Sequence, residues 1–203
     1  MYALTSSGFL NPTLFDLCIQ NLNKAKSTIS VCIITTASIP FKENDKWAQH
    51  TKNYLTEKGM RNIQFFDFEF DDISQLINHD IVFISGGNPF HLLYHIKKVK
   101  AESTLSQIAK SSKILIGVSA GALALTKGVK YIKEFNSIMN FDKPNSIGLK
   151  DFIGLGLQNI NLFPHYDLFL QMNPNLENAL RNIEQRDNVE ITRLNNTDYL
   201  FYE

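Results

Sequence analysis

The most constraining feature of this chain is the stretch Lys113–Thr126, which reads KILIGVSAGALALT. Its apolar run, residues 114–116, predicts a short buried strand, and the small residues after Gly121 predict a helix. Between them lies G-x-S-x-G at residues 117–121, a pattern that has mechanical meaning between a strand and a helix. The stretch therefore predicts an α/β fold in which Ser119 stands on a sharp turn at the end of a strand.

Such a turn favours chemistry at Ser119. It lifts the serine hydroxyl clear of the sheet, and Gly117 and Gly121 leave room where a Cβ would meet neighbouring backbone. The first N–H groups of the following helix have no partner within the helix, and that of Ala120 lies beside the hydroxyl. We therefore predict that Ser119 is a nucleophile and that the Ala120 N–H forms half of an oxyanion site.

The first two thirds of the chain alternate strand and helix patterns with short connections. The segment TISVCIIT, residues 28–35, is apolar on both faces, as in a strand that is covered from both sides. At 203 residues, the chain is expected to form one domain over residues 1–203, a three-layer α/β fold with a mostly parallel sheet and helices on both faces. Strands are predicted at residues 2–5, 28–35, 62–66, 80–84 and 114–118.

The last third of the chain has weaker patterns. Residues 130–135 read as a strand, and residues 159–163 as another that ends at Pro164-His165. Residues 175–186 have helical spacing. Residues 189–193 and 199–202 alternate around Asn195-Asn196 and read as a closing hairpin.

A serine nucleophile needs a base within hydrogen-bond reach, and the chain has five histidines. His165 follows an apolar strand, at the edge where Ser119 is expected, and we favour it as the base. His50 and His79 stand among polar residues and are expected at the surface. His91 and His95 have the four-residue spacing of metal ligands, but no carboxylate or cysteine signature accompanies them. A surface stripe is favoured over a zinc site there, and no metal site is predicted.

The group that orients the base is open from the residues alone. In hydrolases with a strand-to-helix elbow it lies between the serine and the histidine in the sequence. The acidic residues of that interval are Glu134, Asp142 and Asp151, and Asp167 lies close to the histidine.

A second special loop, residues 85–88, follows the strand predicted at 80–84. Gly86-Gly87 supplies N–H groups with no side chain in the way, which suits the second half of an oxyanion site. Asn88 reads as the N-cap of the next helix and Pro89 as its first residue. Because both loops follow strands of one parallel sheet, we expect them to be neighbours in space.

Composition excludes several classes of function. Lys+Arg and Asp+Glu number 20 each, so nothing favours a nucleic-acid or anionic-membrane partner. No apolar run reaches the roughly 18 residues of a membrane span. The two cysteines, Cys18 and Cys32, are expected to be reduced core residues. With no signal-peptide pattern at the N-terminus, a cytoplasmic protein is expected.

Three segments together resemble one known family: FISGGNPFHLL at 83–93, GVSAGALAL at 117–125 and FPHYD at 163–167. The chain resembles the peptidase E family of serine peptidases, which is related to cyanophycinase and shares the fold of class I glutamine amidotransferases. The resemblance implies that Ser119 is the nucleophile and His165 the base. It also implies Glu134 as the third member of a triad and no requirement for a metal or an organic cofactor.

The resemblance also assigns the glycine loop. The Gly87 and Ala120 N–H groups would form the oxyanion site, with Gly86 in the same loop and Asn88 holding that loop in place. Ser85 stands where a third glycine is usual in the family.

The resemblance implies a serine-type peptidase that hydrolyses a small peptide, as a dipeptidase does, or a related amide, through an acyl-enzyme. The family's aspartate-specific dipeptidases share a basic stretch after the histidine; here that region reads MNPNLENALRNIEQR, and Arg181 is the one candidate in it. The alternatives are a non-catalytic descendant that binds a ligand or partner and, more weakly, an esterase of the α/β-hydrolase type. The sequence does not define an oligomeric state.

Overall fold

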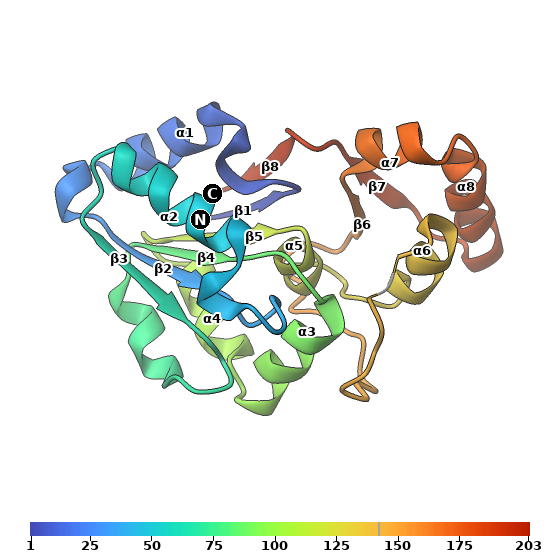
Figure 1. The fold of residues 1–203 in the computed structure, drawn as a ribbon, viewed down its shortest axis with the longest axis horizontal. Coiled ribbons are helices and arrows are strands. Elements are labelled where there is room, and N and C mark those ends of the chain that lie inside the picture. Colours follow the sequence, from blue (N-terminus) through green and yellow to red (C-terminus); the bar gives the residue numbers. More distant parts are fainter. Residues whose placement is uncertain (142) are drawn as a thin grey trace.

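A six-stranded sheet with strand order β3-β2-β4-β5-β1-β8 forms the centre of the molecule (Figure 1). The computed structural model describes residues 1–141 and 143–203. A separate two-stranded sheet pairs β6 with β7. The strands are β1 (Tyr2–Thr5), β2 (Ser30–Ile34), β3 (Asn62–Phe66), β4 (Ile81–Ile84), β5 (Ile114–Val118), β6 (Asn161–Pro164), β7 (Ile191–Leu194) and β8 (Tyr199–Tyr202).

Helices connect most of these strands. None of those described has both the length and the apolar character that a membrane span requires. They are α1 (Pro12–Leu22), α2 (Lys46–Glu57), α3 (Pro89–Lys98), α4 (Glu102–Ala109), α5 (Ala120–Leu125), α6 (Ile132–Met139), α7 (Tyr166–Met172) and α8 (Leu176–Asp187).

The central sheet is parallel except at one edge. β2 pairs in parallel with β3 and β4, and β5 pairs in parallel with β4 and β1. β8 adds to the free side of β1 in the antiparallel direction. The sheet is therefore mostly parallel, as the alternation of strands and helices predicts.

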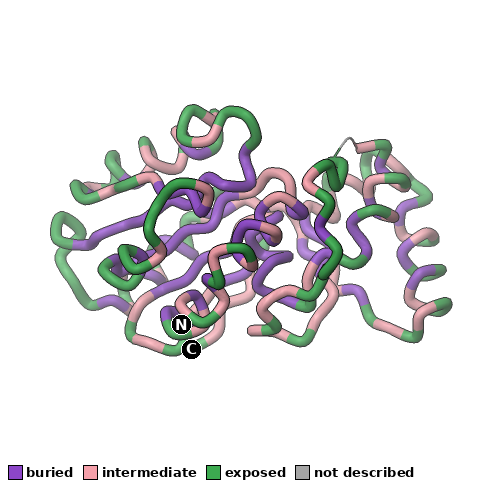
Figure 2. Tube along the Cα trace, turned by 90° about the horizontal axis from the view of Figure 1, so that it is seen from below, coloured by how far each residue is buried: buried purple, intermediate pink, exposed green. Residues whose placement is uncertain are grey.

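Hydrophobic clusters cover both faces of this sheet. On one face, Val31 packs in a cluster with Leu14 of α1 and Leu55 of α2. On the other, Cys32 belongs to a cluster that includes Leu92 of α3 and residues of α4 and α5. All residues of β2 and β4 are buried, and the buried segments run through the interior in Figure 2. The three-layer arrangement predicted from the sequence is confirmed.

The last third of the chain forms a group of its own beside the main sheet, where β6, β7, α6, α7 and α8 lie together (Figure 1). The strand predicted at residues 130–135 is wrong, because Ile132–Met139 is helix α6. The buried side chains there, Tyr131, Ile132, Phe135 and Met139, recur at helical spacing.

The hairpin predicted around Asn195-Asn196 is also wrong. β7 pairs in parallel with β6, whereas β8 pairs with β1 in the main sheet. Each segment is a strand, as its alternation predicts, but the two belong to different sheets. The turn at residues 195–198 therefore crosses from one sheet to the other.

Candidate active site

Ser119 occupies a strained backbone conformation between β5 and α5, with φ 49° and ψ −105°. A positive φ in a residue with a side chain is rare and costs on the order of 1–3 kcal/mol. The turn is held at both sides of Ser119: its N–H donates to the Thr5 carbonyl at 2.9 Å, and its carbonyl accepts from the Leu123 N–H at 3.0 Å. The surrounding structure therefore fixes the tight turn that the sequence predicts.

The two glycines of the motif are required by the close approach of neighbouring backbone. A Cβ on Gly117 would lie 2.8 Å from the Ala122 nitrogen, and one on Gly121 would lie 2.4 Å from the Ile84 carbonyl oxygen. Both distances are shorter than any ordinary carbon contact. Only glycine allows α5 to pack this closely over the ends of β5 and β4.

The glycine loop after β4 lies directly against Ser119. A Cβ placed on Gly86 would lie 3.2 Å from the Ser119 Cβ and 3.8 Å from its Oγ. Gly87 has φ 142°, and a Cβ there would lie 2.1 Å from the Ala37 carbonyl oxygen. In the part of the chain that the structure describes, neither the Gly87 nor the Ala120 N–H donates a hydrogen bond. The two loops that the sequence places at one edge of the sheet thus lie together.

Asn88 ties the glycine loop to its surroundings. Its N–H donates to the Ala37 carbonyl at 2.7 Å, and its Oδ1 accepts from the Phe90 and His91 N–H groups at the start of α3. Its Nδ2 donates to the Pro144 carbonyl at 2.9 Å. Asn88 is thus both the N-cap predicted from the sequence and an anchor for residues 85–88.

His165 follows β6, in a left-handed conformation with φ 58° and ψ 29°. His165 thus follows an apolar strand, as predicted, but β6 belongs to the smaller sheet and not to the main one. The contact with the main sheet is made instead by Ser6, whose Oγ accepts from the His165 N–H at 2.9 Å. Because Thr5, the preceding residue, binds the Ser119 N–H, two consecutive residues at the end of β1 hold the backbones of Ser119 and His165.

The His165 ring is oriented by an amide rather than a carboxylate. His165 Nδ1 lies 2.8 Å from Asn196 Oδ1, which also accepts from the Ser7 hydroxyl at 2.6 Å. Because Oδ1 is an acceptor, Nδ1 carries the proton and Nε2 is left as the basic nitrogen. Asp167 supports the ring through Asn196, since its Oδ1 accepts from the Asn196 N–H at 2.6 Å.

Burial lowers the pKa of His165 from its ordinary value, and the hydrogen bond that the ring donates to Asn196, with the nearby charge of Asp167, only partly offsets that effect. The neutral imidazole is therefore favoured. Among the described residues, Asn196 is the one hydrogen-bond partner of the ring, and the Ser119 hydroxyl has none.

Glu134 does not contact His165, contrary to the expectation from the resemblance. It lies in the first turn of α6, where it receives two hydrogen bonds from Arg186, at 2.8 and 3.1 Å. The physical reason is that this segment forms helix α6, packed on α8, and not the strand predicted at residues 130–135. Asp151 pairs with Lys97 at 2.8 Å, and Asp142 lies outside the described residues.

The residue that sequence reasoning missed is Asn196. Its only local signal is an Asn-Asn pair between two strand-like segments, which we interpreted as a hairpin turn. Arg181 is exposed and pairs with Glu177 of the same helix, at 2.8 Å.

The remaining histidines differ in part from expectation. His50 is exposed, as predicted, but His79 is buried. His91 and His95 do not form a surface stripe: His95 is buried, and both rings face the carboxylate of Glu69.

Comparison with known proteins agrees with this architecture. The model of Peptidase family S51 matches residues 2–203. An uncharacterized peptidase of Pasteurella multocida is 30% identical over 159 residues, which cover 76% of this chain and 73% of the relative. An uncharacterized peptidase of Listeria monocytogenes is 28% identical over 94 residues, 46% of this chain and 43% of the relative.

Two solved structures share the fold. The crystal structure of a candidate peptidase E from Listeria monocytogenes EGD-e has a TM-score of 0.75 at 24% identity, over 99% of this chain and 93% of that one. A peptidase from an acI-B1 Actinobacterium has a TM-score of 0.66 at 19% identity, over 98% of this chain and 81% of that one. At these identities the likeness shows the fold, and the family follows from the match over residues 2–203. The chain belongs to peptidase family S51, the peptidase E family of serine peptidases.

Proposed function

We propose that this serine peptidase hydrolyses a small peptide, as a dipeptidase does, or a related amide, with Ser119 as nucleophile and His165 as base. The observation that carries the proposal is the arrangement at the end of β1, where Thr5 and Ser6 hold the backbones of Ser119 and His165. Two residues 46 positions apart in the sequence (165 − 119) are thereby brought to one edge of the fold. The small-peptide class of substrate comes from the resemblance to the family's dipeptidases.

In the proposed mechanism, the Ser119 hydroxyl attacks the carbonyl carbon while His165 Nε2 takes its proton. The oxyanion that forms accepts hydrogen bonds from the Gly87 and Ala120 N–H groups, which have no acceptor among the described residues. The imidazolium then gives its proton to the leaving amine, and an acyl-enzyme remains. Water, activated by the same imidazole, releases the acid and restores the Ser119 hydroxyl.

The Ser119 hydroxyl need not touch the ring in the free protein. Hydrogen bonds between catalytic groups are often long before substrate binds and become shorter in the complex. The left-handed backbone of His165, together with its bond to Ser6, fixes the start of the side chain, and the ring beyond it is the part that would adjust when substrate binds.

Asn196 takes, in this proposal, the positioning role expected of Glu134. It fixes the tautomer of His165 but adds no negative charge to stabilise the imidazolium. Asp167 supports it by accepting from the Asn196 N–H. Gly86 leaves space beside the hydroxyl and Asn88 holds the loop, so neither acts on the substrate directly.

A labelling experiment tests the nucleophile. The full chain is treated with a fluorophosphonate probe, and the modified peptide is identified by mass spectrometry in the wild type, in Ser119→Ala and in the matched control Ser112→Ala, which changes an exposed serine. We expect labelling of Ser119 in the wild type and in Ser112→Ala, and none in Ser119→Ala. Unchanged labelling of Ser119→Ala would remove Ser119 as the nucleophile.

A panel of dipeptides, short amides and esters then tests the substrate. We expect turnover of at least one dipeptide, reduced by on the order of 10⁴–10⁶ in kcat by Ser119→Ala or His165→Ala. Ester turnover without any amide turnover would contradict the peptidase assignment of this site.

A further inference from the structure

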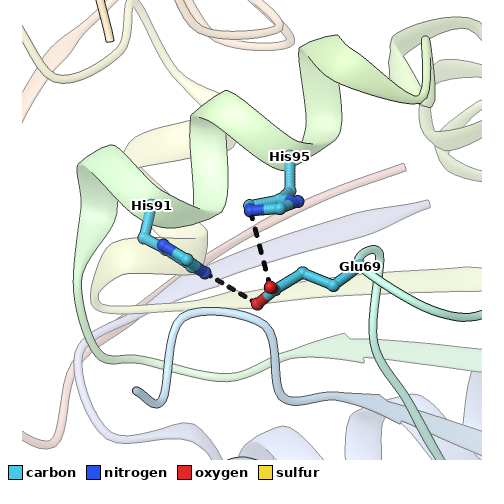
Figure 3. A group of neighbouring side chains, drawn as sticks. All are labelled: Glu69, His91 and His95. Atoms are coloured by element: carbon cyan, nitrogen blue, oxygen red, sulfur yellow. Dashed lines mark hydrogen bonds and ion pairs between the residues drawn. The ribbon is translucent and has the colours of Figure 1, made fainter. Parts of the chain in front are cut away.

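Three side chains outside the proposed catalytic site converge on one point. Figure 3 shows both imidazole rings of His91 and His95 directed at the carboxylate of Glu69. His91 Nε2 lies 2.8 Å from Glu69 Oε1, and His95 Nε2 lies 3.8 Å from Glu69 Oε2. One donor atom from each of the three residues lies within 4.8 Å of the others. The two histidines stand one turn apart on α3, and the glutamate comes from the loop after β3.

We propose that Glu69, His91 and His95 bind a divalent transition-metal ion of the zinc class. Two imidazoles and one carboxylate form a donor set that Zn²⁺ accepts, with a fourth position for water. Bonds of about 2.0–2.1 Å in a tetrahedral site place donor atoms roughly 3.3 Å apart. The pairs at 2.8 and 3.8 Å lie on either side of that value. The two distances join His91 and His95 to different oxygens of Glu69, and the three donor atoms lie within 4.8 Å of one another, so rotations of these side chains would bring the donors to that spacing.

His95 adds an independent reason to expect a ligand. The residue is 5% exposed, and its Nδ1 is buried without a hydrogen-bond partner among the described residues. Its Nε2 is too far from Glu69 for a hydrogen bond. A buried imidazole that lacks strong partners is unfavourable. A metal ion would supply a strong partner at Nε2, the nitrogen that faces Glu69; it would not contact Nδ1.

The neighbouring charges permit a cation to enter. Lys42 pairs with Glu69 and competes with a metal for this carboxylate. Its Nζ also lies 2.9 Å from Asp67 Oδ2, so Lys42 keeps a partner if Glu69 turns to a metal. The side chain of Glu69 is 22% exposed and that of His91 is 12% exposed, which leaves one side open to solvent. An ion can thus reach the site without opening the core.

The position of the cluster suggests what a bound ion does. It joins the loop after β3 to the first two turns of α3. The N–H of His91 donates to Asn88 Oδ1, so the metal would brace the helix directly behind the glycine loop. The expected consequence is a more stable fold, and this expectation does not depend on the peptidase mechanism.

Calorimetric titration with zinc chloride tests the site. The full chain is first stripped with a chelator and exchanged into a buffer that does not bind metals. We compare the wild type, Glu69→Gln and His91→Ala with the control His50→Ala, which removes an exposed histidine elsewhere. We expect one equivalent of zinc in the wild type and the control, and binding weaker by at least about 100-fold in the two cluster variants.

Two further measurements complete the test. Zinc should raise the Tm of the wild type and of His50→Ala but leave those of Glu69→Gln and His91→Ala unchanged, whereas magnesium chloride should raise none, because it prefers oxygen ligands. Cobalt chloride should give the visible absorption of a tetrahedral N/O site only where His91 and Glu69 are intact. Far-UV circular dichroism verifies that the variants are folded. Equal zinc affinity in the wild type and in a folded His91→Ala, or no binding in the wild type, would overturn the proposal.

Discussion

At the scale of single residues, the two candidate catalytic residues share an unusual backbone. Ser119 and His165 both have positive φ, at 49° and 58°. Each has its N–H held at the end of β1, through the carbonyl of Thr5, its last residue, and the hydroxyl of Ser6, which follows it. The strain is thus stored where neighbouring groups over-determine the conformation, which is typical of functional sites.

The burial of His165 predicts how activity depends on pH. Burial disfavours the imidazolium, so the folded-state pKa lies below 6.5 and the ring stays neutral to lower pH than a free histidine. Activity should fall as the pH drops through that lowered value. We expect the acid limb of kcat/KM, measured on the best dipeptide, to have an apparent pKa below 6.5. An acid limb clearly above 6.5 would contradict this assignment of the base.

Replacement of Asn196 should move the same limb. Asn196→Asp places a carboxylate on Nδ1, stabilises the imidazolium and shifts the acid limb to higher pH; Asn196→Ala removes a hydrogen bond that raises the pKa and shifts it lower. Loss of ring orientation in Asn196→Ala should also reduce kcat by about 100-fold. Asn195→Ala is the neighbouring control and should keep both the wild-type limb and kcat. A limb that stays fixed in both Asn196 variants would show that the amide does not act through the ring.

At the scale of elements, the contact between α5 and β4 has no spare room. A Cβ on Gly121 would lie 2.4 Å from the Ile84 carbonyl oxygen and 3.0 Å from its Cβ. Gly121→Ala should therefore push α5 away from the sheet and lower the free energy of unfolding by about 3 kcal/mol. Urea denaturation measures the change, with Ser112→Ala as a surface control that stays within about 0.5 kcal/mol. An unchanged midpoint would contradict the close packing described.

The elements that the sequence predicts correctly are those with local signals. β3 and β5 have the predicted bounds. β5 is a short buried apolar run, and β3 is an edge strand in which apolar and polar residues alternate at its start. The segment at residues 130–135 is too short to identify as a helix, and its helical face becomes clear only when the buried positions up to Met139 are taken together. The last two strands were correctly recognised as strands, but the partners of each lie far away in sequence, where a local pattern carries no information.

The site shows the same difference between features with a local sequence signal and features that depend on distant contacts. The serine turn, the glycine loop and the Asn88 cap are each encoded within a few residues, and the structure places them as the sequence predicts. The partner of the histidine was not predictable. Asn196 reaches the ring because the chain crosses between two sheets, and Glu134 is held away by Arg186, a pairing that depends on how α6 packs on α8.

At the scale of the whole molecule, one buried serine joins the two sheets. Ser6 follows β1 and is 1% exposed. Its hydroxyl donates to the Leu194 carbonyl at the end of β7, at 3.1 Å, and accepts from the His165 N–H just after β6. The position of the smaller sheet relative to the larger therefore depends on this side chain.

Removal of that hydroxyl should lower both the stability of the fold and kcat. Ser6→Ala leaves two buried groups without their partner, which should lower the free energy of unfolding by about 1–3 kcal/mol. We expect kcat to fall as well, because His165 loses its link to β1, while Ser119, held by the Thr5 carbonyl, keeps its backbone conformation. Ser7→Ala, which leaves both Ser6 bonds intact, is the matched comparison for stability. Wild-type stability and kcat in Ser6→Ala would refute the link.

The crossing of the chain between the two sheets at residues 195–198 has a consequence for when the catalytic residues come together during folding. The elbow serine is set by β5, β1 and α5, all of which precede residue 126, whereas the amide that orients the imidazole arrives about 70 residues later (196 − 125 = 71). A folding intermediate with the parallel core complete but β8 not yet docked on β1 would hold a nucleophile without an aligned proton acceptor. On the proposed mechanism, hydrolysis therefore requires this crossing segment to be in place, and a chain in which it is not yet docked does not attack peptides around it.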